Sequence, residues 1–490
     1  MTHQLIGGER RTGSGGTFEV LDPSTNESIE TVRLATAGDV DAAVGAARAA
    51  YPQWSTATPV ERAGVLHKAA ALLEERASEI AELEARQAGK PIRLATEFDV
   101  PGTIDNTAFF GAAARRLDGL AQGEYSGDHT SSIRREAIGV VGSIAPWNYP
   151  LQMAAWKVLP AIAAGNTIVL KPAEITPLTS LIFGEIFAEA GAPAGVVNVI
   201  TGTGPEAGAH LVGHPQVDMV SFTGSTGVGR QVMATASATG KRVHLELGGK
   251  APFVVFEDAD LDAAIHGAVA ASLINAGQDC TAATRAIVHR SVYAAFVDGV
   301  AELMSAVRLG PTLDPETDLG PLSSQAHQAK VAGMVDRARA YAVVRSGGRV
   351  PVGDLAKGCY YEPTLVADVP IGSELWTDEV FGPVLAAVPF DDDDEAIRLA
   401  NDTAYGLAAS AWTRDTYRAG RAAREIRSGC VWVNDHIPII SEMPHGGFRG
   451  SGFGKDMSPY SFDEYTNIKH VMHDITASVE KPWHRTIFSI

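Results

Sequence analysis

The alternation of strand and helix patterns through the middle of the chain constrains its fold more than any other feature. LQMAAWKVLPAIAAG predicts a helix, NTIVLKP a strand, PLTSLIFGEIFAEAG a helix and GVVNVITG a strand. HPQVDMVSFTGS then predicts another strand, and TGVGRQVMATASA another helix. Strands that alternate with helices favour a parallel sheet covered on both faces. The sequence therefore predicts an α/β fold.

A second α/β block follows, from about residue 250 to 450. Its predicted strands are APFVVFED, TRAIVHR, YEPTLVADV, EVFGPVLAAVPFD, GLAASAWT and GCVWVN, and its predicted helices include DLDAAIHGAVAASLINAG and DTYRAGRAAREI. Ahead of the first block, residues 4–34 predict short strands and turns, residues 36–86 have helical periodicity, and a further helix is expected at roughly 103–120. A chain of 490 residues is long enough for two or three domains.

Charge and cysteine content exclude several classes of function. Acidic residues outnumber basic ones by 58 to 40, which disfavours a general binder of nucleic acid or anionic membranes. The N-terminus lacks an apolar core of signal-peptide length, and no window approaches the roughly 18 apolar residues of a membrane span. Three cysteines form a poor disulfide framework, and no CxxC or HExxH spacing is present. We expect a cytoplasmic protein without a structural metal.

Two short stretches carry the residues with the clearest chemical potential. LELGGKAP places Glu246 beside a Gly-Gly turn, and NAGQDCTAA places Cys280 among small residues that would not block a substrate. The two residues are 34 positions apart (280 − 246), so only the fold can bring them together. If they meet, the cysteine can act as a nucleophile and the glutamate as the base that activates water. Taken alone, a buried cysteine and an exposed strand-end acid are the commoner interpretations.

The unit SFTGSTGVGR places Gly224, Gly227 and Gly229 where a predicted strand meets a predicted helix. Glycines at such a junction allow a phosphate to approach the backbone N–H groups of the helix N-terminus. The spacing GSTGVG differs from GxGxxG, and a simple turn would give the same pattern. From these residues alone, both interpretations stay open.

Eight motifs occur in one order along the chain, namely IAPWNYP, AGNTIVLKPAE, SFTGST, LELGGKAP, GQDC, EVFGPV, WVN and PHGG. In this order the chain resembles, over essentially its whole length, the aldehyde dehydrogenase superfamily of NAD(P)-dependent enzymes that oxidise aldehydes to carboxylic acids. The closing run WVNDHIPIISEMPHGGFRGSGFGKDMSPYSFDEYT most resembles the bacterial γ-aminobutyraldehyde dehydrogenases within it. Betaine-aldehyde dehydrogenases are close relatives of that group.

The resemblance implies a division of the chain into three parts. A Rossmann-like NAD-binding domain would cover 1–117 and 138–248, and an α/β catalytic domain would cover 249–450. A small β oligomerisation element would cover 118–137 and 464–490, and members of the family assemble as homodimers or homotetramers. The residues after about 476 extend beyond the usual end of the family. We expect their apolar end, WHRTIFSI, to dock on its own or a neighbouring subunit.

The same resemblance implies a catalytic role for three residues. Cys280 matches the nucleophile that attacks the aldehyde to give a thiohemiacetal. Asn148 matches the residue whose amide, with the Cys280 backbone N–H, stabilises the oxyanion, a contribution of roughly 3–4 kcal/mol for one such donor. Hydride transfer to the nicotinamide then leaves a thioester. Glu246 matches the base that activates water to hydrolyse it.

Cofactor contacts are implied in the same way. Lys171 and Glu174 match the pair that holds the adenosine ribose, and a glutamate there would repel a 2′-phosphate, which favours NAD over NADP. The other matching positions lie near the pyrophosphate, the adenosine half or the nicotinamide ribose, and they are Trp147, Gly224, Ser225, Glu379 and Phe381. Lys157 matches a lysine that lies in a proton path in some members, and we expect a structural role for it here.

The implied substrate is an ω-aminoaldehyde such as 4-aminobutanal. Its ammonium end would need carboxylates or aromatic faces. Tyr149 and Trp156 match positions that line the substrate tunnel, although core packing is an equally reasonable role for Trp156. Further acidic or aromatic candidates have no motif match, and they are Asp99, Asp105, Asp279, Glu442 and Trp376.

Three alternatives stay open from the sequence. The first is a related enzyme for betaine aldehyde or for aliphatic aldehydes in general. The second is a binding or structural protein built on an inactive scaffold, against which the intact set of Cys280, Glu246 and Asn148 argues. The third is an acylating enzyme that transfers the thioester to coenzyme A, which a water-activating Glu246 disfavours.

Overall fold

The computed structural model describes residues 3–489. The predicted strand–helix alternation builds an eight-stranded sheet with the order β19-β11-β10-β7-β8-β9-β1-β2. Its five central strands run parallel, as predicted, and they are β7 (Val140–Ile144), β8 (Thr167–Lys171), β9 (Val197–Val199), β10 (Met219–Thr223) and β11 (Arg242–Glu246). The edges are antiparallel, because short strands outside the alternation join there, namely β1 (Gln4–Ile6), β2 (Glu9–Arg11) and β19 (Gly452–Phe453).

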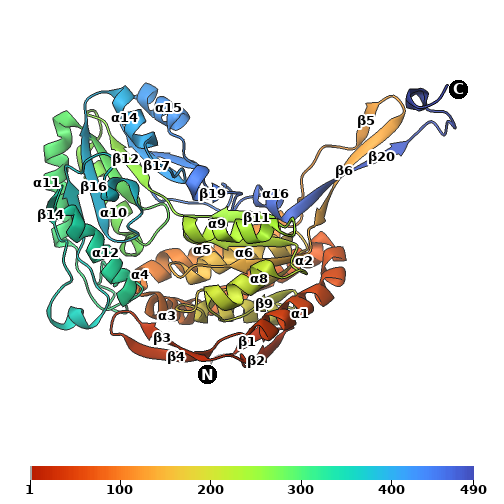
Figure 1. Ribbon diagram of the computed structural model, residues 1–490, viewed down its shortest axis with the longest axis horizontal. Helices are drawn as coiled ribbons and strands as arrows, with labels where there is room; N and C mark the ends of the chain where they lie inside the picture. Colours follow the sequence, from red (N-terminus) through yellow and green to blue (C-terminus); the bar gives the residue numbers. More distant parts are fainter. Residues whose placement is uncertain (1–2, 490) are drawn as a thin grey trace.

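Helices cover both faces of this sheet (Figure 1). They are α1 (Ala37–Thr56), α2 (Pro59–Glu75), α3 (Ala77–Ala88), α4 (Ile92–Leu94), α5 (Val100–Ala113), α6 (Pro150–Ala163), α7 (Leu178–Glu189), α8 (Ala209–Gly213) and α9 (Thr226–Ser237). The helix predicted at 103–120 instead ends at Ala113, because the charged residues after Ala114 lie outside the core. A single π-helical turn, Ala95–Asp99, leads into it.

A second, seven-stranded sheet has the order β14-β15-β16-β13-β12-β17-β18. Its strands are β12 (Ala251–Val255), β13 (Ala283–His289), β14 (Val343–Ser346), β15 (Thr364–Ala367), β16 (Val384–Phe390), β17 (Ala408–Trp412) and β18 (Cys430–Val433). Its helices are α10 (Leu261–Leu273), α11 (Arg290–Ala306), α12 (Gln325–Ala338), α13 (Glu374–Thr377), α14 (Asp393–Asn401) and α15 (Thr416–Glu425). The sequence patterns did not predict α12 or β14.

The chain passes from the first sheet to the second between β11 and β12. The limits of the three predicted domains stay a prediction.

A three-stranded sheet projects away from the rest of the molecule (Figure 1). It is formed by β5 (Gly123–Ser126), β6 (His129–Ala137) and β20 (Thr466–Asp474), which follows α16 (Ser461–Tyr465). β20 pairs with β6 along its whole length. The C-terminal segment lies at the tip of the arm that these three strands form, and Lys481 there makes an ion pair of 2.7 Å with Asp474.

A separate hairpin joins β3 (Thr17–Asp22) to β4 (Glu27–Arg33).

The two large sheets place their loops around a common cavity. Loops after β7, β10 and β11 contribute one side, and the segments ahead of β13 and β16 contribute the other. Ligands of open parallel sheets bind at this carboxyl-terminal edge. Among residues 3–489, no helix is long and apolar enough to cross a membrane.

Candidate active site

The cavity between the two sheets collects most of the residues that the sequence singled out. Its lining includes Trp147, Asn148, Tyr149, Trp156, Gly224, Ser225, Cys280, Glu379 and Phe381. Glu246 lies directly behind it, next to the lining residues Leu247 and Gly248. Lys171 and Glu174 lie outside this lining, at the end of β8. Residues from at least five separate segments thus converge on one space.

Glu246 and Cys280 lie close together, as the spacing argument required. A carboxylate oxygen of Glu246, the Sγ of Cys280 and a ring nitrogen of His445 all lie within 4.8 Å of one another. Glu246 ends β11 and is 1% exposed, so its carboxylate is almost completely removed from bulk water. A thiol and a carboxylate are therefore within reach of one small substrate.

The backbone around Cys280 explains why its neighbours are small. Asn275 and Ala276 adopt left-handed conformations, with φ of 49° and 56°, and Gly277 follows with φ of 70°. A Cβ on Gly277 would lie 2.1 Å from the carbonyl oxygen of Gly382, and a Cβ on Gly249 would lie 2.2 Å from the carbonyl oxygen of Cys280. Only glycine allows this approach of the two motifs.

Asn148 is held in a fixed orientation beside the nucleophile. Its side-chain Nδ2 donates to the backbone carbonyl of Gln278 over 2.9 Å, and its backbone carbonyl accepts from the side-chain amide of Asn275 over 2.8 Å. An Nδ2 group has two protons, and this bond uses one of them. The second N–H is available to an oxygen bound near Cys280, which is the geometry of an oxyanion donor.

The electrostatics of the cavity are dominated by acidic groups. Burial raises the pKa of the Cys280 thiol well above its usual value, and the charges of Asp279, Glu246 and Glu379 add to this. The resting thiol is therefore protonated at neutral pH, and a base must remove its proton before it attacks. Glu246, which lies within 4.8 Å of the Cys280 Sγ, is positioned to remove this proton.

His445 is a site residue that sequence reasoning missed. Its Nε2 lies 3.2 Å from Oε1 of Glu246. Burial disfavours the imidazolium, but the attraction of Glu246 outweighs it and raises the pKa of His445 above its ordinary value. PHGG served only as a family marker, and no local pattern in the sequence places its histidine beside Glu246.

Cofactor-binding geometry is present along the carboxyl-terminal edge of the first sheet. The Ser225 hydroxyl accepts from the N–H of Val228 and caps α9, and a Cβ on Gly227 would meet no atom within 4 Å. This helix N-terminus is therefore open to a phosphate. The ammonium of Lys171 lies 3.7 Å from the carboxylate of Glu174, and burial lowers the pKa of Lys171 to about 8.

The nicotinamide side of the predicted cofactor site has an acid and an aromatic wall. Glu379 accepts the N–H of Gly249 over 2.8 Å, and burial raises its pKa. Phe381 has φ of 61°, and its ring meets that of Trp147 edge-on with centroids 5.4 Å apart. Two carboxylates that can accept ribose hydroxyls, an open helix N-terminus and an apolar wall fit a dinucleotide.

Acidic and aromatic groups also line the substrate side. The hydroxyl of Tyr149 donates to Asp279 over 2.8 Å, and the ammonium of Lys90 lies 4.1 Å from the centre of the Tyr149 ring. The ring of Trp156 lies 4.8 Å from that of His445, and its indole N–H has no hydrogen-bond partner within residues 3–489. Tyr149 and Trp156 thus border the space beside the nucleophile.

Of the candidates without a motif match, Asp279 lines the cavity and the others lie elsewhere. Trp376 is buried in the second core, where its indole N–H donates to Asp402 and the Arg285 guanidinium covers its ring. The remaining three are Asp99, ion-paired with Lys90; Asp105, which accepts from Ser441; and Glu442, which is exposed. Lys157 forms a buried ion pair of 2.8 Å with Asp456, a contact that fits a structural role.

Comparison with known proteins identifies relatives across nearly the whole chain. A family model described as the aldehyde dehydrogenase family matches residues 10–471. The NAD+ complex of an aldehyde dehydrogenase from Bacillus cereus is 40% identical, with a TM-score of 0.95 and coverage of 97% of each chain. PnpE from Pseudomonas sp. WBC-3 is 38% identical, with a TM-score of 0.96 and coverage of 99% and 100%. A variant betaine aldehyde dehydrogenase from Staphylococcus aureus is 34% identical, with a TM-score of 0.95 and coverage of 98% of each chain.

Proposed function

The chain belongs to the aldehyde dehydrogenase family, and we propose from this that it oxidises an ω-aminoaldehyde such as 4-aminobutanal to the carboxylic acid with NAD. The observation that supports this most directly is the placement of Cys280, Glu246 and His445 within 4.8 Å of one another at the end of an acidic, aromatic cavity. An aldehyde carbon has no leaving group, so a covalent sulfur adduct is needed before hydride can depart.

Cys280 and Asn148 carry the first half of the proposed reaction. The thiol loses its proton to Glu246, and the thiolate attacks the carbonyl carbon. The free N–H of the Asn148 amide and the backbone N–H of Cys280 hold the developing oxyanion. NAD, when bound, accepts the hydride, and a thioester on Cys280 remains.

Glu246 carries the second half. After passing its proton to solvent, it accepts a proton from a water molecule that attacks the thioester. Its contact with His445 supports this role, because the imidazole Nε2 lies 3.2 Å from Oε1 and helps to hold the carboxylate in place. Release of the acid then restores the thiol.

NAD would be held by the residues along the carboxyl-terminal edge of the first sheet. We assign its adenosine ribose to Lys171 and Glu174, its pyrophosphate to the open N-terminus of α9, and its nicotinamide ribose to Glu379. The remaining contacts are assigned to Trp147, Gly224, Ser225 and Phe381. The Glu174 carboxylate disfavours the 2′-phosphate of NADP. Relatives solved with NAD bound support NAD as a cofactor of this family fold.

A cationic substrate end suits the charge of the cavity. Asp279 lies in the lining beside Tyr149 and Trp156, and aromatic faces and carboxylates both attract an ammonium group. Betaine aldehyde, which also has a cationic end, is the alternative that the similarity to the Staphylococcus enzyme supports.

A panel of aldehydes tests the substrate and the cofactor together. We expect kcat/KM for 4-aminobutanal with NAD to exceed the values for betaine aldehyde, for hexanal and for NADP by about tenfold or more, a difference of about 1.4 kcal/mol each. Asp279→Asn should reduce kcat/KM for 4-aminobutanal and change kcat/KM for hexanal little, because only the ammonium group of 4-aminobutanal is attracted to the Asp279 carboxylate. A wild-type preference for hexanal would refute the aminoaldehyde assignment.

We also propose a cytoplasmic homo-oligomer, a dimer or tetramer, assembled through the arm formed by β5, β6 and β20. In the single chain, apolar side chains are exposed on β20 and on the C-terminal segment that follows it. They include Ile468 and Met472 on β20, and Ile475, Trp483, Ile487 and Phe488 after it. The last residue of the predicted docking segment, 490, lies outside the described residues. A neighbouring copy of this chain would cover these side chains.

Deleting residues 477–490 tests this role of the C-terminal segment. We expect a smaller assembly in sedimentation experiments, or a lower Tm at the same assembly size, because the apolar end would no longer bury its side chains. Phe488→Ser is the milder matched variant and should change Tm in the same direction. Unchanged size, Tm and activity in the deletion would show that the segment docks nowhere.

A further inference from the structure

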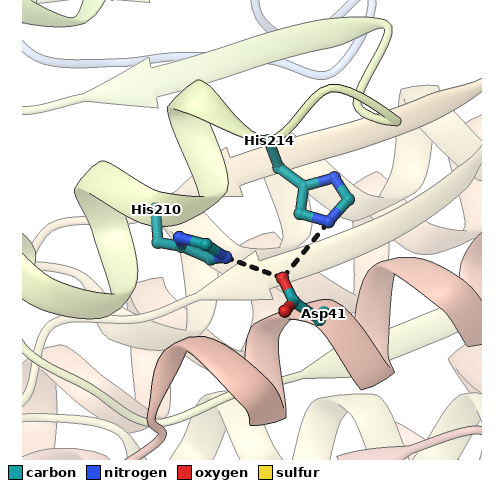
Figure 2. Close-up of side chains that lie close together, drawn as sticks. All are labelled: Asp41, His210 and His214. Carbon is teal, nitrogen blue, oxygen red and sulfur yellow. Dashed lines mark hydrogen bonds and ion pairs between the residues drawn. The ribbon is translucent and has the colours of Figure 1, made fainter.

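Two groups of side chains in the described residues bring metal-ligand atoms together, and only one of them is suited to an ion. The first consists of Asp41, His210 and His214. Figure 2 shows both imidazoles directed at the same carboxylate oxygen, with His210 Nε2 at 2.6 Å and His214 Nε2 at 3.3 Å from Oδ1 of Asp41.

In this surface group, hydrogen bonds already use the ring nitrogens that a metal would need. Nδ1 of His214 accepts the backbone N–H of Gln216 over 3.1 Å, so the proton of the neutral ring lies on Nε2. Nε2 then donates to Asp41 and has no lone pair to offer a cation. Binding a metal there would break the Gln216 bond. The cluster is therefore a satisfied hydrogen-bonded group.

The second group, here called the cavity trio, consists of Glu246, Cys280 and His445. Both carboxylate oxygens of Glu246 and Nε2 of His445 are buried without a well-aligned hydrogen bond to residues 3–489. Their 3.2 Å contact is a charge contact, and it leaves acceptor positions unused. Cys280 and His445 line the cavity, so a small ion can reach them from solvent.

Thiolate, imidazole and carboxylate together form a ligand set that Zn²⁺ prefers. Ligand atoms of a tetrahedral Zn²⁺ lie roughly 3.3–3.8 Å apart, given metal–ligand distances of about 2.0–2.3 Å. The atoms of the cavity trio are within 4.8 Å of one another, so shifts of about 1 Å would suffice. A fourth position facing the cavity would take water.

The surrounding charges favour a dication. The carboxylates of Asp279 and Glu379 act on Cys280 from the same cavity. On the opposite side, the ammonium of Lys455 donates to the Gly446 carbonyl and is attracted to Glu246. Lys157 is neutralised by its ion pair with Asp456. Lys330 in the cavity lining and Lys250 act on Glu379. The Sγ of Cys280 itself is under the influence of three carboxylates, those of Glu246, Asp279 and Glu379.

We propose that the cavity trio binds one Zn²⁺ ion and that this ion reversibly shuts off the enzyme. Binding replaces the thiol proton of Cys280 and the Nε2 proton of the His445 imidazolium, and both protons pass to solvent. The carboxylate of Glu246 and the freed Nε2 of His445 are the other two ligands. The inference rests on the proposed function for its inhibitory effect, since nucleophile and base would both be occupied. The binding itself does not depend on which aldehyde is the substrate.

The test is a Zn²⁺ titration of metal-free full-length enzyme, with NADH formation measured at each concentration. We expect inhibition at micromolar Zn²⁺ that a chelator reverses. His445→Phe and His445→Gln should each weaken inhibition by about tenfold or more relative to their own uninhibited rates, because one of three ligands is lost. His210→Ala, which removes a ligand atom from the surface group, should retain the sensitivity of the unaltered enzyme.

Three outcomes would overturn the proposal. Full sensitivity in both His445 variants would mean that Cys280 binds zinc alone, and loss of sensitivity in His210→Ala would place the ion in the surface group. Absence of inhibition would mean that the trio does not bind zinc.

Co²⁺ supplies a readout that needs no turnover. A sulfur-to-cobalt charge-transfer band should appear in the unaltered enzyme and in His210→Ala, disappear in Cys280→Ala, and weaken in the His445 variants. A band in a protein that oxidises no aldehyde would refute the proposed function and leave the zinc site standing. An active enzyme without the band would refute the metal site and leave the proposed function standing.

Discussion

Replacing Cys280 with alanine is expected to lower NAD-dependent aldehyde oxidation by at least about 10⁴-fold, the scale associated with loss of a covalent nucleophile. No other thiol can substitute, because Cys359 is fully buried with its Sγ 3.4 Å from Asn26, and Cys430 belongs to β18 in the second sheet. Steady-state NADH formation and the pre-steady-state burst should both vanish, while binding of NAD should persist.

Cys359→Ala and Cys430→Ala are the matched controls, and both should keep the burst and most of the steady rate. The Cys280→Ala result also decides between an enzyme and a binding protein on an inactive scaffold. Substantial turnover in Cys280→Ala would contradict covalent catalysis altogether. A wild-type protein without any aldehyde-dependent NADH formation would revive the inactive-scaffold alternative.

Replacing Glu246 with glutamine is expected to separate the two halves of the reaction. The first turnover should still release about one NADH per active site, although more slowly, because the thiol can lose its proton to solvent. Steady turnover should fall by about 10²- to 10⁴-fold, the usual contribution of a general base. Stopped-flow measurement of NADH and the intact mass of the acylated protein would check both halves.

Glu464→Gln is a suitable control for this variant, because Glu464 is a partly buried carboxyl group that lies outside the cavity lining. It should keep wild-type turnover. Loss of the burst in Glu246→Gln would show that Glu246 is required before the thioester forms, most directly for removing the thiol proton. An absolute requirement of the wild-type enzyme for coenzyme A would instead indicate the acylating alternative.

Local patterns were sufficient to predict the strands that carry the site. The strands β8, β9 and β10 were predicted because most of their residues are apolar or β-branched and each run ends at a turn, a composition that suits a buried parallel strand. The edge strand β19 has two residues, and β14 alternates only weakly, so neither has a pattern long enough to identify. The helix α12 begins in the polar run SSQAHQAK, whose apolar stripe is narrow.

Side-chain geometry around the nucleophile was predictable only in part. Motif order was sufficient to select Cys280, Glu246 and Asn148, but nothing local indicates that His445, 199 positions beyond Glu246 (445 − 246), approaches the same carboxylate. Trp376 shows the opposite error, since an aromatic residue near a motif need not face the cavity. Its indole N–H instead donates a hydrogen bond to the Asp402 carboxylate inside the core around the seven-stranded sheet. Such placements depend on how two distant sheets pack, which periodicity does not encode.

The clearance between Gly249 and Cys280 couples the two motifs physically. The carbonyl of Cys280 lies where a side chain on Gly249 would begin, so the second glycine of LELGGKAP sets how far the nucleophile loop can advance. Any larger residue would push the sulfur away from both Asn148 and Glu246. The close contact between the two stretches therefore sets the distance from the Cys280 sulfur to Asn148 and Glu246. Substitutions of Tyr149 or Trp156 that reshape the substrate cavity are compatible with catalysis only while this contact is kept.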